Sequence, residues 1–101
     1  MSYETRRESQ DSVFVGLDKP KKYKVLMHND DYTSMEFVID VLTTIFRKSE
    51  GEAVRLMQKI HTEGHAVCGV YTLEIAETKV EQTIEKARAS GFPLRCTMEE
   101  E

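Results

Sequence analysis

The residues best suited to chemistry are four polar side chains in a row, His28-Asn29-Asp30-Asp31, together with His61 further along the chain. Amide, carboxylate and neutral imidazole groups all offer hydrogen-bond acceptors, and carboxylates and imidazoles also bind metal ions. Each group also has an ordinary structural explanation. Asn and Asp favour turns because their side chains bond nearby backbone groups, and His61 could be a half-buried helix residue. Spacing alone leaves both explanations open.

A metal site is the main alternative use of these groups. His61 and His65 are four residues apart, a spacing that suits zinc on a helix, and a neighbouring Asp could complete a His/Asp site. However, the metalloprotease pattern needs Glu directly after the first His, where this chain has Thr62. Gly64 is also a helix-ending residue that would turn His65 away. The chain shows no Gly-rich phosphate loop and no triad-like Ser or Cys, so we predict neither a cofactor nor an enzyme.

The polar run lies between a predicted strand and a predicted helix. Residues 23–27 alternate, with Tyr23, Val25 and Met27 on one side and Lys24 and Leu26 on the other, which indicates a strand that the Asn and Asp residues end. Thr33 and Glu36 have the spacing of a capping box, and the apolar residues behind them recur at helical intervals. The pattern therefore predicts a helix over 34–46.

His61 lies near the end of a second predicted helix. Ser49 and Glu52 form another capping box, and Gly64 is the expected C-cap. A strand over 66–72, a helix over 74–90 and a strand over 94–98 follow.

The predicted order is strand, helix, helix, strand, helix, strand. A sheet of three strands is too small to carry helices on both of its faces, so we expect an α+β fold in which three helices pack on one face of a small three-stranded antiparallel sheet. The chain of 101 residues suits one domain, which we place at 22–101 after a polar, flexible tail over 1–21.

Composition excludes several classes of partner. A net charge of −4 argues against nucleic acid, because phosphate binding needs a basic face. No run approaches the roughly 18 apolar residues of a membrane span, and the first residues do not read as a signal peptide. We therefore expect a cytoplasmic protein, in which Cys68 and Cys96 are buried free thiols.

Many short motifs, in the right order and with matching gaps, closely resemble the ClpS family of Clp protease adaptors. The resemblance covers about residues 22–98 and is carried by Tyr23-Lys24-Val25, Asn29-Asp30-Asp31-Tyr32-Thr33, Met35-Glu36-Phe37-Val38, His61, Cys68-Gly69-Val70-Tyr71-Thr72, Glu74, Ala76-Glu77-Thr78-Lys79 and Pro93-Leu94. It implies the ClpS fold, which is similar to the C-terminal domain of the ribosomal stalk protein. Ser34 stands where many relatives carry Pro, from which we expect a slightly less rigid helix start.

The resemblance also implies a function. ClpS proteins bind proteins whose first residue is a bulky hydrophobe (Leu, Phe, Tyr or Trp) and deliver them to the N-terminal domain of ClpA, an AAA+ unfoldase that feeds the ClpP protease. They are adaptors and catalyse no reaction. A plain interaction domain without a peptide pocket is the second alternative.

The resemblance assigns roles to individual residues. The contacts to the substrate's α-amino group fall on Asn29, Asp31 and His61, with Asp30 and Thr33 beside them. The pocket for the first side chain falls on Met35, Val38, Met57, Ile60 and Leu94. The unfoldase-binding surface falls on Glu74 and Lys79. These types suit the task, because a protonated amino terminus has three donors and no acceptor, so it needs converging acceptors beside an apolar pocket.

Overall fold

The computed structural model describes residues 19–101, so the predicted tail lies outside the described residues except for its last few positions. The elements are β2 (Tyr23–His28), α1 (Met35–Thr44), α2 (Glu50–Glu63), β3 (His65–Tyr71), α3 (Leu73–Ala89) and β4 (Arg95–Glu100). Their order is the predicted one. None of the helices within this range combines the length and apolar content that crossing a membrane requires.

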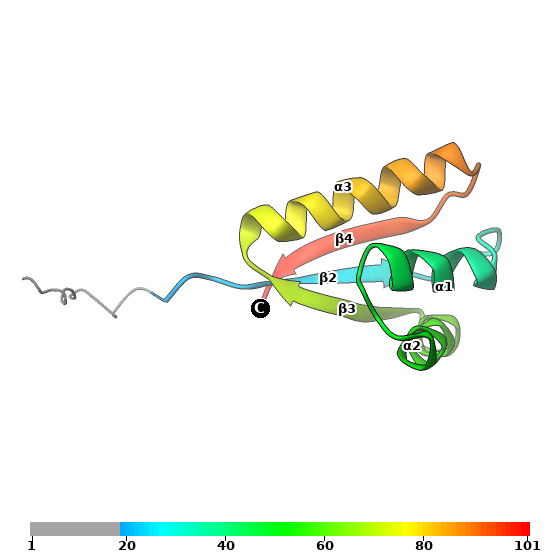
Figure 1. The fold of residues 1–101 in the computed structure, drawn as a ribbon, viewed down its shortest axis with the longest axis horizontal. Helices are drawn as coiled ribbons and strands as arrows, with labels where there is room; N and C mark the ends of the chain where they lie inside the picture. The colour runs from blue at the N-terminus through cyan, green and yellow to red at the C-terminus, as the bar shows by residue number, and fades with distance from the viewer. Residues whose placement is uncertain (1–18) are drawn as a thin grey trace, which may run out of the picture.

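The strands form one antiparallel sheet in the order β3-β2-β4, with β2 in the centre. Helix α3 runs along the β4 side of the sheet, and α2 lies on the β3 side with α1 beside it (Figure 1). All three helices contribute to a single core with the inner face of the sheet. The predicted α+β fold is confirmed.

Alternation along the strands decides which side chains enter this core. Val25 and Met27 of β2 are fully buried on the inner face. Leu26 points to the open face, yet it is only 7% exposed because it lies between Val67 of β3 and Thr97 of β4. On the face without helices, the neighbouring strands therefore cover the apolar side chain that β2 places there.

The two cysteines are free and buried, as predicted. Cys68 lies on β3 and Cys96 on β4, on either side of β2. Burial raises the pKa of the Cys68 thiol to about 12 and that of the Cys96 thiol to about 11. Thiolates are the reactive form, so both cysteines are structural and unreactive at neutral pH.

The start of α1 differs from the prediction. The N-cap is Ser34, whose Oγ accepts the backbone N–H of Phe37 at 3.1 Å. The capping box predicted for Thr33 does not form, because the Thr33 hydroxyl donates to the Asp30 carboxylate at 2.7 Å. Ser34 therefore supplies an N-terminal hydrogen bond that a Pro at this position could not supply.

Ser34→Ala is expected to lower the free energy of unfolding by about 1 kcal/mol, the usual cost of losing an N-cap side chain. Urea denaturation of the variant and the parent measures the difference. Thr72→Ala is the matched control, since Thr72 is the N-cap of α3 but makes no capping bond with its side chain. Equal losses for the two variants would contradict the capping role of Ser34.

Helix α1 also ends earlier than the predicted residue 46. It ends at Thr44, and Arg47 takes a left-handed backbone with φ of 60°. The N–H groups of Phe46 and Lys48 donate back to carbonyls of the last turn of the helix. Phe46 stays buried because the chain folds back over the helix end, which explains why its apolar character extended the helical pattern.

Candidate functional site

A cavity of about 260 Å³ lies where the β2–α1 loop, the start of α1 and the end of α2 meet. It is lined by Asn29, Asp30, Asp31, Thr33, Met35, Val38, Met57, Ile60 and His61. Its volume is just below the roughly 300–1,000 Å³ typical of ligand pockets. The cavity therefore suits one side chain and the backbone attached to it.

The cavity has an apolar side and a polar side. The apolar side is a buried wall formed by Val38 from α1 and by Met57 and Ile60 from α2, each less than 10% exposed. The side chains of Asn29 and Asp31 from the loop, and of His61 from α2, belong to residues exposed to solvent. Residues from two segments about 30 positions apart thus surround one opening.

Asp30 shapes the loop that carries Asn29 and Asp31. Its carboxylate accepts the backbone N–H groups of Tyr32 and Thr33 at 2.8 and 2.7 Å, and the Thr33 hydroxyl as well. Partial burial raises the pKa of the Asp30 carboxyl, but the bonds from Thr33 and Tyr32 outweigh it, so the pKa lies below its usual value. Asp30 is therefore ionised and engaged within the loop. Within residues 19–101, these bonds involve neither the Asn29 side chain nor the Asp31 side chain.

The histidine spacing does not build a metal site. Gly64 ends α2 in a left-handed conformation, and His65 begins β3, where its ring lies 6.0 Å from that of His28. Burial and the nearby Arg95 and His65 lower the pKa of His28. Among the residues that the structure describes, no three His, Cys, Asp or Glu side chains converge on one point.

Leu94 is not among the residues that line the cavity. It directly precedes β4, is 6% exposed, and lines a separate depression with Phe92 and Cys96. Its side chain belongs to the core.

Glu74 and Lys79 lie on α3, away from the cavity. Glu74 is exposed in the first turn, between the exposed apolar side chains of Leu73 and Ile75. Lys79 is engaged within the fold: its ammonium donates to the Ile45 carbonyl at 2.6 Å and lies 5.7 Å from the centre of the Tyr71 ring.

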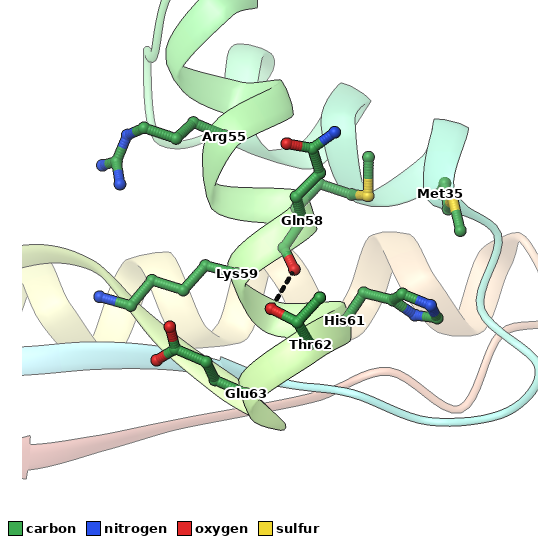
Figure 2. Close-up of a pocket in the computed structure, with 8 residues that line it drawn as sticks. Met35, Arg55, Gln58, Lys59, His61, Thr62 and Glu63 are labelled. Atoms are coloured by element: carbon green, nitrogen blue, oxygen red, sulfur yellow. Dashed lines mark hydrogen bonds between the residues drawn. The ribbon is translucent and has the colours of Figure 1, made fainter.

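Sequence reasoning missed a second, more open concavity beside the first. Its volume is about 640 Å³, and it shares Met35, Met57 and His61 with the cavity. Figure 2 shows the His61 ring and Met35 on one side of α2, with Arg55, Lys59 and Glu63 on the other. No signal in the sequence distinguishes this exposed face from any other solvated helix face.

Comparison with known proteins decides the family. A family model described as "ATP-dependent Clp protease adaptor protein ClpS" matches residues 18–97. The chain belongs to the ClpS family. It is therefore an adaptor of the ATP-dependent Clp protease and not an enzyme, as the resemblance implied.

Individual ClpS relatives are similar in sequence to this chain over most of its length. The ClpS adapter of Oleidesulfovibrio alaskensis is 53% identical over 96 residues, which cover 95% of this chain and 92% of the relative. That of Maricaulis maris is 57% identical over 83 residues, or 82% of this chain and 76% of the relative. The solved structure of Agrobacterium tumefaciens ClpS2 bound to L-phenylalaninamide matches with a TM-score of 0.80 and 46% identity, covering 82% of this chain and all of that one.

Proposed function

We propose that this ClpS-family adaptor recognises proteins by a free α-amino group together with a bulky hydrophobic first side chain, such as Leu, Phe, Tyr or Trp. The observation that carries the proposal is the cavity that combines Asn29, Asp31 and His61 with a buried apolar wall. The ligand of the similar ClpS2 structure supports it, since L-phenylalaninamide has a free α-amino group, an aromatic side chain and a neutral carboxamide in place of a carboxylate.

Amino-group recognition follows from the donor count. A free α-amino group has a pKa of about 8, so at neutral pH it is mostly ammonium, with three donors. The Asn29 amide oxygen, the Asp31 carboxylate and a neutral nitrogen of His61 supply three acceptors. An internal peptide bond has one N–H and no charge. Each hydrogen bond to a charged group contributes roughly 1.5–3 kcal/mol, so a blocked terminus loses most of this stabilisation.

Side-chain recognition follows from the apolar wall. Full burial of a Leu or Phe side chain contributes roughly 1.5–3 kcal/mol. Val38 and Ile60 are held by the core, whereas Met35 is 49% exposed, so its flexible side chain can adapt to ligands of different shape. Because binding also costs roughly 4–15 kcal/mol in lost freedom, we expect an affinity on the order of micromolar. Such an affinity allows the adaptor to release its cargo.

The partner in delivery is proposed to be the N-terminal domain of a ClpA-type unfoldase, in the cytoplasm. The exposed start of α3 around Glu74 offers a surface separate from the cavity, flanked by the exposed Leu73 and Ile75. Lys79 lies on the same helix, and its bond to the Ile45 carbonyl would fix that helix against α1. Two separate surfaces would let cargo and unfoldase bind at the same time, with residues 1–21 as the proposed tether.

A peptide array that varies only the first residue tests the proposed function. We expect binding when the first residue is Leu, Phe, Tyr or Trp, and weak binding for Ser, Asp or Lys. Acetylating the α-amino group of the Leu peptide should abolish binding, because acetylation removes the charge and two donors. Equal affinity for the free and acetylated peptides would contradict amino-group recognition, and a flat array would support a plain interaction domain instead.

A further inference from the structure

The backbone of Asn29 is bonded to the end of the helix that carries His61. Strands β2 and β3 pair in antiparallel register up to His28 and His65, which places Asn29 opposite Gly64 at the end of the ladder. The Asn29 N–H donates to the Gly64 carbonyl at 2.8 Å. This bond continues the ladder by one step, beyond the sheet and into the site.

Gly64 is also the residue that ends α2. Its N–H donates to the Ile60 carbonyl at 2.9 Å and so closes the last helical turn, which contains Ile60 and His61. One residue therefore bonds to the helix turn through its N–H and to the cavity loop through its carbonyl. Because Asn29 and His61 are distant in sequence, their relative position depends on this connection.

The backbone of Gly64 has φ of +94°, a conformation that residues with a side chain rarely adopt. No heavy atom lies within 4 Å of the position that a Cβ would occupy there, so a substitution meets no steric obstacle. The effect of a side chain would come from the backbone alone. A relaxed φ would rotate the peptide plane after Gly64 and turn its carbonyl away from Asn29.

We propose that Gly64 is a positioning residue for amino-group recognition, holding Asn29 beside the helix turn that carries His61. This inference rests on the proposed function of the cavity and assigns a role to a residue that does not line it. Gly64 contacts no ligand itself. It acts through the direction of its carbonyl, which only a left-handed backbone provides at this junction.

Gly91 is a matched control within the same chain. It also follows a helix with a positive φ, of +78°, and no heavy atom lies within 4 Å of its Cβ position. Its N–H donates to the Arg88 carbonyl at 3.0 Å, at the end of α3 and before Phe92, where no cavity residue lies. Gly64→Ala and Gly91→Ala therefore impose a similar backbone strain, and only the first acts on the Asn29 loop.

The experiment measures the affinity of the full chain and each variant for two probes. One is a Leu-starting peptide, and the other is the same peptide with a hydroxyl group in place of the α-amino group. We expect Gly64→Ala to weaken binding of the amino peptide by about tenfold, comparable to the loss of one charged hydrogen bond, and to reduce the preference for amine over hydroxyl. Gly91→Ala should leave both affinities unchanged. Gly64→Asn should lower the preference less than Gly64→Ala does, but still below that of Gly91→Asn, because Asn enters the left-handed region more readily than Ala and less readily than Gly.

The outcomes separate the two proposals. If the parent chain binds both probes equally, the proposed amino-group recognition fails, and the role of Gly64 fails with it. If the parent prefers the amine but Gly64→Ala keeps that preference unchanged, only the positioning role is overturned. If Gly64→Ala does not fold, Gly64→Asn decides: a preference that falls below that of Gly91→Asn supports the role, and an equal preference overturns it.

Discussion

Asp31→Asn is expected to weaken binding of a Leu-starting peptide by roughly 10- to 100-fold, the effect of losing one hydrogen bond to a charged group. Asn keeps the size of the side chain and one acceptor oxygen. It removes the negative charge and adds an amide group whose donors would face the donors of the ammonium. Within residues 19–101 the Asp31 carboxylate has no role in the hydrogen bonds of its own loop, which Asp30 maintains.

Fluorescence anisotropy with a labelled peptide measures this loss directly. Glu85→Gln is the control, because Glu85 is exposed on α3, does not line the cavity, and its substitution makes the same change in net charge. The thermal stability of both variants should match that of the parent. If Asp31→Asn and Glu85→Gln bind equally well, the attraction is general electrostatics and Asp31 is not an amino-group contact.

Leu42→Ala is expected to lower the free energy of unfolding by roughly 2–5 kcal/mol, the range for a large-to-small change in a packed core. Leu42 is 0% exposed on α1 and lies in the core that joins this helix to α2 and the sheet. A domain of this size is stable by only about 5–15 kcal/mol, so the loss is a large share of the total. The cavity is lined by residues of both α1 and α2, so it exists only while these two helices stay packed together.

Chemical denaturation with a circular dichroism readout measures the loss. Leu73→Ala makes the same truncation on a helix at a position that is 44% exposed, and it should change stability by no more than about 0.5 kcal/mol. Leu42 does not line the cavity, so peptide affinity should persist wherever the variant is folded. Similar losses for the two variants would show that the α1 contact contributes little to stability.

The recognition proposed for this adaptor uses two kinds of surface. In the proposed function, the polar residues Asn29, Asp31 and His61 recognise a free chain terminus, and the apolar wall selects the first side chain. Neither part would suffice alone, because a hydrophobic cavity of about 260 Å³ would accept internal residues, and three acceptors would accept any free amino end. Selectivity for a terminus with a bulky residue requires both at one opening.

The order of the elements could be predicted from the sequence because it follows from local patterns. Alternation over 23–27 marked β2, and Ser49 and Gly64 marked both ends of α2. The start of α1 was mistaken where two residues compete for one function. Both Thr33 and Ser34 are good N-caps, and the choice fell to Ser34 because Asp30 holds the Thr33 hydroxyl. The two candidate N-caps are neighbours in the sequence, but which one caps the helix depends on the position of Asp30 in three dimensions, which residue spacing does not reveal.

By itself, the sequence determined the fold class, the family resemblance and the residue types available for binding. The tertiary structure alone decided which of them share a cavity. It joined Asn29 to the end of α2 through Gly64, left Leu94 outside the cavity, and engaged Lys79 with the Ile45 carbonyl. The physical reason is that periodicity reports only contacts between near neighbours in the chain. Contacts between residues more than 30 positions apart depend on strand register and helix packing, which form only when the whole core assembles.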